Sequence, residues 1–221
     1  MYRLFGFVLL AGLLMQAPAM ADTNTKLFKN YGYDDPIALF TEEKGYFECP
    51  DFSDTVLCKT GVEFLGAEFD LILYFDQNTL SHIALFSEFD SVLYAKAIGA
   101  LTNSFTLLRM RGAGEQVDLV ELTRNSSSKA EMKKIINNFE RNRLEEGHLE
   151  VEFIEVSAAD AKNRENVEDV ISHAPSTVRV ATMIVFEDED EGEDFIMLAF
   201  TQPRLQQAKV KRIIESTTEK F

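Results

Sequence analysis

The chain has 221 residues, 46% hydrophobic and 27% charged, with 22 basic against 37 acidic residues and a net charge of −15. This composition excludes a disordered chain, a collagen-like repeat and a disulfide-dense miniprotein. The acidic excess argues against nucleic acid as a partner and disfavours anionic membrane surfaces, because phosphate groups attract basic surfaces.

The first 21 residues have the order of a secretory signal peptide. Arg3 gives a positive start, residues 4–14 form an apolar run, and Ala19-Met20-Ala21 is a small-x-small cleavage site. The alternative, an uncleaved anchor helix, needs ~20 apolar residues to cross a bilayer, more than this run supplies. We therefore expect a mature chain of residues 22–221 with 21 basic and 37 acidic residues, a net charge of −16. Such a protein is periplasmic or secreted and is not embedded in the membrane.

Both cysteines, Cys49 and Cys58, lie in the mature chain, and a turn-prone segment with Pro50 separates them. An even count in an oxidising compartment predicts a disulfide between them. Two other functions of the pair fit the sequence less well. The spacing is not Cys-x-x-Cys, and no histidine cluster lies nearby to complete a zinc site.

Hydrophobic periodicity and capping residues predict helices interspersed among strands. In chain order we expect a short helix at 36–43, strands at 55–64, 68–76 and 79–88, a helix at 91–101 and a hairpin over 105–123. A helix at 128–146, a strand at 149–156 and a long mixed connection at 157–177 with a short helix follow, and then strands at 178–186 and 195–201 and a helix at 203–216. Asp90 or Ser91 is the expected cap of the second helix, and Ser128 with Glu131 is a capping box.

This order is typical of an α+β fold with a mainly antiparallel sheet, built as a single domain over residues 22–221. The stretch 71–88 with the following helix resembles the stretch 183–202 with its own helix. This likeness suggests an internal duplication of a hairpin-plus-helix unit, with halves at about 46–125 and 126–221. The alternative is that any two antiparallel hairpins followed by helices look alike. The many Phe and Tyr residues lie mostly in strands and helix faces, so we expect them in the core.

Motifs for catalysis are missing from the sequence. His82, His148 and His173 are in no metal-ligand spacing, and there is no Gly-x-Ser-x-Gly nucleophile elbow. The run 112–114 is a hairpin turn rather than a phosphate-binding loop. We therefore assign no catalytic residue and no cofactor, and we predict a protein that is not an enzyme. An enzyme whose site is assembled from distant residues is the alternative.

The most unusual local feature is a run of acids at a predicted hairpin tip. It consists of Glu187, Asp188, Glu189, Asp190, Glu191, Glu193 and Asp194. Such oxygens could hold Ca²⁺, although the EF-hand register fails. They could instead attract a basic partner. The third interpretation is a solvated turn whose charges prevent edge strands from pairing with other chains.

These observations lead to one hypothesis and two alternatives. The hypothesis is an exported, non-enzymatic binding protein that engages a basic protein, in the manner of an inhibitor or immunity protein against a basic cell-wall hydrolase. The alternatives are a module that binds a small molecule or a cation, and the enzyme with a dispersed site. The apolar strands could also pair across a homodimer.

Overall fold

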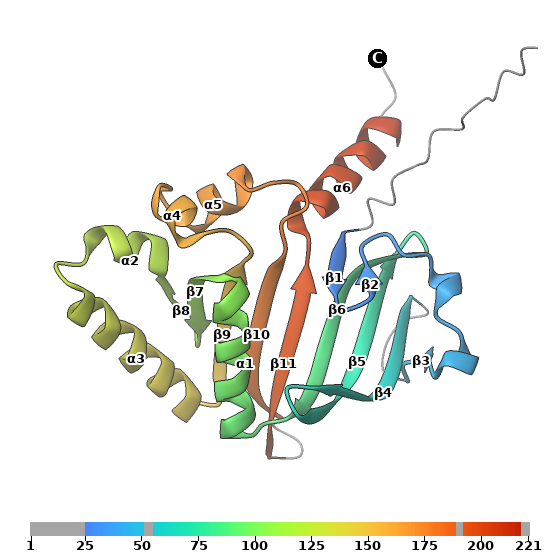
Figure 1. The fold of residues 1–221 in the computed structure, drawn as a ribbon, viewed down its shortest axis with the longest axis horizontal. Coiled ribbons are helices and arrows are strands. Elements are labelled where there is room, and N and C mark those ends of the chain that lie inside the picture. The colour runs from blue at the N-terminus through green and yellow to red at the C-terminus, as the bar shows by residue number, and fades with distance from the viewer. Residues whose placement is uncertain (1–24, 51–54, 189–191, 218–221) are drawn as a thin grey trace, which may run out of the picture.

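In the computed structural model, which describes residues 25–50, 55–188 and 192–217, the chain forms an α+β fold around one large antiparallel sheet (Figure 1). The strands are β1 (Lys26–Phe28), β2 (Tyr31–Gly32), β3 (Phe47–Glu48), β4 (Val56–Phe64), β5 (Ala67–Asp76), β6 (Thr79–Glu88), β7 (Thr106–Gly112), β8 (Glu115–Asp118), β9 (His148–Ile154), β10 (Val180–Asp188) and β11 (Glu193–Thr201). The helices are α1 (Ser91–Ser104), α2 (Leu119–Asn125), α3 (Lys129–Glu145), α4 (Ala158–Lys162), α5 (Val167–His173) and α6 (Pro203–Thr217). Two short 3-10 helices are Ile37–Leu39 and Glu42–Lys44. The predicted signal peptide lies outside the described residues.

The large sheet has nine strands in the order β3-β4-β5-β6-β11-β10-β9-β7-β8, and all its neighbours are antiparallel. The predicted α+β class is confirmed. Strands β6 and β11, one from each half of the hypothetical duplication, pair at the centre. This arrangement brings the two similar hairpins side by side, and the duplication itself stays a prediction.

Local sequence signals place the hairpins and helices that build this sheet. The β5–β6 turn places Gln77 at φ 52° and Asn78 at φ 62°, the two positive values that a type I′ hairpin turn needs. Helix α1 begins where the Asp90 carboxylate accepts a hydrogen bond from the Leu93 amide, 2.8 Å away. Helix α3 begins in the same way at Ser128.

Two segments differ from the prediction. Residues after Asp118 form helix α2 rather than the far strand of a hairpin, because the Asp118 carboxylate caps the amides of Val120 and Glu121. The connection at 157–177, where one short helix is predicted, contains two, α4 and α5, capped by Ser157 and Asn166. Both differences depend on a polar side chain that bonds its own neighbouring backbone.

The main core lies on one side of the large sheet, which we call the core face. Helices α1 and α3 and the small β1–β2 sheet lie in front of the large sheet in Figure 1, and their apolar residues pack on it. Buried residues of the sheet on this side include Leu71, Leu73, Ile83, Leu85 and Leu198. Because side chains alternate along a strand, the residues between them point to the opposite side.

The opposite side, which we call the open face, is covered at one end only. There Leu108, Ile154 and Val180 pack against residues of α2, α4 and α5 in a second, smaller core. Further along β10, Ile184 and Phe186 are partly exposed, as is Phe86 on β6, and these three residues belong to neither core. Within the described chain, therefore, the middle and the far end of this face have no covering layer.

The predicted disulfide is confirmed. Cys49 and Cys58 are bonded, with their Cα atoms 5.2 Å apart, and they link the edge strand β3 to β4, where Phe47 faces Cys58. Both cysteines of the chain are thus used. No helix among the described residues has the length and apolar content that a bilayer crossing requires.

Candidate functional site: the open face of the sheet

The strand registers place the side chains of the open face in rows that run across the sheet. From β5 through β6, β11, β10 and β9 to β7, one row contains Ile72, Ala84, Ala199, Thr182, Glu152 and Arg109. The next row contains Asp70, Phe86, Met197, Ile184, Glu150 and Arg111. The third, from β6 to β9, contains Glu88, Phe195, Phe186 and His148. Neighbours in a row have Cβ atoms about 5 Å apart. The face therefore has an apolar centre with charged residues on both sides.

Three phenylalanines form the centre of this face, and we call them the aromatic patch. The ring centroids of Phe86 and Phe195 are 4.8 Å apart, and Phe186 lies 6.1 Å from the first and 6.0 Å from the second. These are the separations at which aromatic rings attract each other. The expectation that the aromatic residues lie in the core is wrong for Phe86 and Phe186, which are partly exposed. Phe195 is buried beside them, although it belongs to neither of the two core clusters.

A groove borders the aromatic patch on the β5 side. Strand β4 carries a bulge in which Thr60 and Gly61 lie opposite the single residue Asp70, and Gly61 has the positive φ of 67° that such a bulge favours. The resulting bulge groove has a volume of 680 Å³. Rings of Phe86 and Phe195 and the carboxylates of Glu68, Asp70 and Glu88 contribute to its lining.

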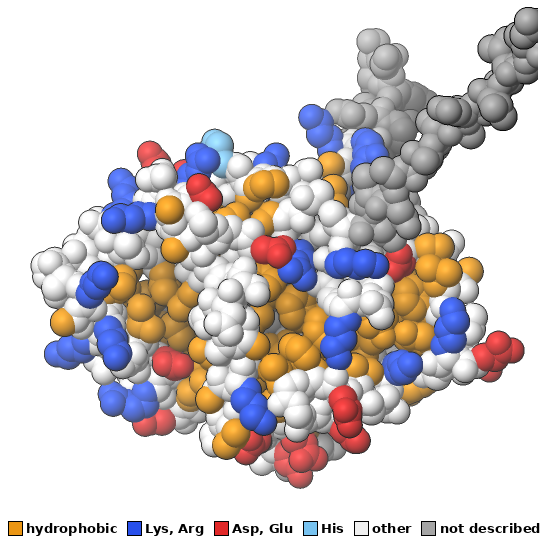
Figure 2. Space-filling model, in the orientation of Figure 1, with side chains coloured by type: hydrophobic (Ala, Val, Ile, Leu, Met, Phe, Trp, Pro, Cys, Tyr) orange, Lys and Arg blue, Asp and Glu red, His pale blue; other side chains and the backbone are white. Residues whose placement is uncertain are grey.

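Acidic residues from three segments of the chain gather at this end of the sheet. We call them the acidic end: Glu68 and Asp70 of β5, Glu88 of β6, and Glu187, Asp188, Glu193 and Asp194 of the β10–β11 hairpin. The hairpin is held beside β6 because the Phe89 amide donates to the Asp194 carbonyl, 2.8 Å away. Figure 2 shows the densest group of Asp and Glu side chains along the lower edge, where this hairpin ends.

Most carboxylates of the acidic end have no cationic partner. Within the described residues, no Lys or Arg forms an ion pair with Glu68, Asp70, Glu88, Glu187, Glu193 or Asp194. The hairpin register even places like charges directly opposite each other, Glu187 against Asp194 and Asp188 against Glu193. Opposed like charges destabilise a strand pair. The arrangement therefore costs folding stability.

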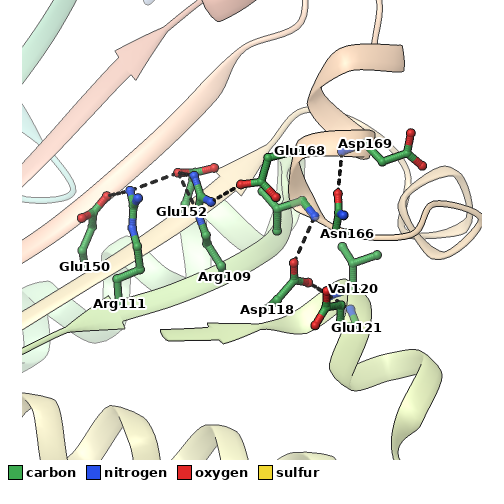
Figure 3. Close-up of polar contacts among 11 residues, drawn as sticks. Arg109, Arg111, Asp118, Val120, Glu121, Glu150, Glu152, Asn166, Glu168 and Asp169 are labelled. Carbon is green, nitrogen blue, oxygen red and sulfur yellow. Dashed lines mark hydrogen bonds and ion pairs between the residues drawn. The ribbon is translucent and has the colours of Figure 1, made fainter. Parts of the chain in front are cut away.

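An ion-pair ladder lies on the other side of the apolar centre, on β7 and β9 (Figure 3). The Arg109 guanidinium lies 3.0 Å from the Glu152 carboxylate and 2.7 Å from that of Glu168 on α5. Arg111 pairs with Glu150 and reaches Glu152 at 3.4 Å. Burial alone would lower the pKa of Arg109, but Glu152 and Glu168 outweigh it and raise this pKa. Both cations are therefore already held by carboxylates.

The three histidines do not assemble a catalytic group. His82 lies on β6, His148 at the start of β9 and His173 at the end of α5. Burial lowers the pKa of His82, whose ring stacks on Tyr74 with centroids 4.1 Å apart. His173 meets Asp169 and Ser172 through one and the same nitrogen, Nδ1, at 2.8 and 3.1 Å. A Ser-His-Asp triad needs the serine on the other nitrogen, so this turn of α5 lacks triad geometry.

The acidic run singled out in the sequence is only partly described. Glu189, Asp190 and Glu191 lie outside the described residues. In the ranges 25–50, 55–188 and 192–217, no group of three or more His, Cys, Asp or Glu is placed to hold a metal ion. The interpretation of the acids as protection for edge strands is wrong, because β10 and β11 are central strands with both edges paired.

Period-two patterns in the sequence indicate which residues lie on the open face. Phe86 follows the core residue Leu85, and Phe195 precedes the core residue Ile196, so period-two alternation already places each phenylalanine on the other side of its strand. Arg109 with Arg111 and Glu150 with Glu152 repeat at the same spacing. Their pairing, and the absence of a described layer over the phenylalanines, needed the sheet order.

Comparison of the chain with family models, with curated proteins and with solved structures gives no match at any of the three levels.

Proposed function

We propose that this is an exported, non-enzymatic binding protein whose acidic end engages a basic protein partner. One observation carries the proposal: on a sheet face without a described covering layer, carboxylates from three separate segments, which form no ion pair within the described residues, lie at one end of an aromatic patch. They are Glu68 and Asp70 of β5, Glu88 of β6 and Glu193 of β11. Exposed apolar patches rimmed by polar residues are typical of protein-interaction sites. Clustered charge of one sign speeds and orients the encounter with an oppositely charged partner.

Export is supported by the leader-like order of residues 1–21 and by the disulfide between Cys49 and Cys58. In the periplasm or outside the cell, a basic cell-wall hydrolase is the concrete form of partner that we propose, bound in the manner of an inhibitor or immunity protein. The expected mature N-terminus is Asp22, which mass spectrometry of the exported protein measures directly.

The test is calorimetric titration of the purified protein with a basic lysozyme-type hydrolase, together with an assay of its cell-wall lysis. We expect binding that weakens by at least about tenfold between about 50 and about 500 mM NaCl, because the attraction is electrostatic. One variant neutralises the hairpin by Glu187→Gln, Asp188→Asn, Glu193→Gln and Asp194→Asn. A matched control makes the same change of charge elsewhere by Glu42→Gln, Glu43→Gln, Glu121→Gln and Glu165→Gln.

The hairpin variant should lose most of the affinity, and the control should keep it, because only the first removes charge from the acidic end. Equal affinity of the two variants would contradict the proposed site. Absence of binding and of inhibition across a panel of basic exported hydrolases would contradict the proposed partner class.

A further inference from the structure

The middle of the open face is an apolar surface of interaction size. Four strands, β5, β6, β11 and β10, contribute to it over three rows of side chains. Strands about 4.8 Å apart and same-face residues about 6.8 Å apart give a surface of about 19 by 20 Å, or about 400 Å². Within it Asp70, Thr182 and Glu88 are polar and the other residues are apolar. Surfaces that combine an apolar patch with a polar rim are typical of interaction sites.

A sheet face of this kind is covered by a layer that packs on it from above. Side chains stand perpendicular to the sheet, so the occupant must lie over the strands rather than extend an edge. The chain itself covers the other side of the sheet with helix α1, which buries Leu93, Ala97 and Leu101, and with the small β1–β2 sheet, whose strand β1 contacts β6 and β11. A helix of about 13 residues is about 20 Å long, which is the length of the open apolar surface.

The charges beside this surface indicate the chemistry of the occupant. Glu68, Asp70 and Glu88 border the aromatic patch and line the bulge groove, and none of them forms an ion pair in the part of the chain that the structure describes. The cations in the three rows of the open face are Arg109 and Arg111, and both are bound in the ion-pair ladder. A second copy of this chain would thus bring no free cation from these rows to the three carboxylates. A basic partner would bring several, so charge complementarity favours it.

We propose that the basic partner docks an amphipathic helix on the open face. Its apolar stripe packs on Phe86, Phe186 and Phe195, and a flanking Lys or Arg enters the bulge groove between Asp70 and Glu88. This inference rests on the proposed function, because it takes a basic partner as given, and it adds the surface and the recognition element. Since about 400 Å² on each side is half of a standard interface, we expect micromolar affinity for the isolated helix.

The test uses the purified protein and three labelled peptides of about 18 residues, long enough to span the surface as a helix. The first has Leu at i, i+3, i+4 and i+7 with Lys on the other positions. The second has the same composition with the Leu positions scrambled, and the third has Glu in place of Lys. We expect the first to bind best by at least about tenfold, because only it offers both the apolar stripe and the positive charge.

Variants then locate the binding surface. Phe86→Thr with Phe186→Thr should weaken binding of the Leu/Lys helix by at least about tenfold, since aromatic residues dominate interface energies. The matched control is Val92→Thr with Ile135→Thr, which removes two exposed apolar side chains from α1 and α3, the helices on the core face. Circular dichroism and thermal melting establish that each variant is folded. Unchanged affinity in a folded double variant would overturn the proposal.

A second readout needs no variant. Carbodiimide labelling of exposed carboxylates in the unchanged protein, read by mass spectrometry, should show that the Leu/Lys helix protects Glu68, Asp70 and Glu88 but not Glu42 and Glu43. Protection of all five to the same extent would overturn the proposal. So would a dimer in sedimentation velocity that dissociates in the Phe86→Thr, Phe186→Thr variant, because a second copy would then occupy the face.

The two proposals fail in distinguishable ways. If hydrolase binding depends on the acidic end but not on the phenylalanines, the proposal of a basic partner is retained and the proposal of a helix-docking surface is contradicted. If neither the hydrolases nor the Leu/Lys helix bind, the proposed function itself is contradicted.

Discussion

The ion-pair ladder and the acidic end lie on the same open face and differ in whether their charges are paired. On β7 and β9, the carboxylates of Glu150 and Glu152 are matched by Arg109 and Arg111, and the Glu152 side chain is only 7% exposed. At the acidic end, exposed carboxylates such as Glu68 and Asp70 have no such partner among the described residues. The paired, largely buried charges of Arg109 and Glu152 link β7 to β9, and the exposed Glu168 adds a contact from α5. Unmatched, exposed charge contributes little to the fold and remains available for a ligand.

The largest effect that tests this comparison is loss of the central carboxylate of the ladder. Glu152→Ala leaves Arg109 and Arg111 with fewer partners in a partly buried site, and we expect it to lower the free energy of unfolding by about 3 kcal/mol. Urea unfolding followed by circular dichroism measures it. Asp70→Ala on the same face is the matched control, with an expected change within about 0.5 kcal/mol. Similar effects of the two substitutions would contradict the inference that the charges of the ladder stabilise the fold more than those of the acidic end.

On the side of the open face that carries the bulge groove, a disulfide rather than an ion pair links neighbouring strands. The disulfide holds β3 to β4, next to the bulge groove. Cys49→Ala with Cys58→Ala should lower the free energy of unfolding by about 2–3 kcal/mol, because the unfolded chain gains the freedom of an open loop. Urea unfolding of the variant is compared with that of the oxidised parent. A variant as stable as the parent would show that strand pairing alone holds this edge.

The substitution with the smallest expected effect raises the free energy of unfolding, whereas the two above lower it. Asp194→Lys places an opposite charge across from Glu187 in place of a like charge. We expect it to raise the free energy of unfolding by about 0.5–1 kcal/mol and to weaken binding of the basic partner. Thermal unfolding and titration measure the two effects on one sample.

The control for this charge reversal is Glu48→Lys, an exposed strand residue that faces Leu57 rather than an acid. It makes the same change of charge without removing a like-charge pair, so it should leave stability and binding nearly unchanged. If Asp194→Lys destabilises the protein, the opposed acids serve the fold and not a partner.

Prediction from sequence succeeded where the cause is local. The turn at Gln77 and Asn78, the caps at Asp90 and Ser128 and the disulfide of Cys49 all depend on residues close in the chain. It failed after Asp118, where a single side chain caps α2 and ends the expected hairpin. At the candidate site it found the acids of the β10–β11 hairpin but not Phe86, Phe186 and Phe195, because alternation marks two sides of a strand without saying which side is covered.

The amino-acid sequence by itself determined the α+β class, the strand and helix periodicities, the acidic charge and the pairing of the two cysteines. These depend on neighbouring residues, on composition, or on the only pairing available. Only the tertiary structure decided that β6 pairs with β11, that carboxylates from β5, β6 and the β10–β11 hairpin meet, and that arginines neutralise one side of the open face. These are contacts between segments far apart in the chain, and their free energy is gained only when the whole sheet is assembled.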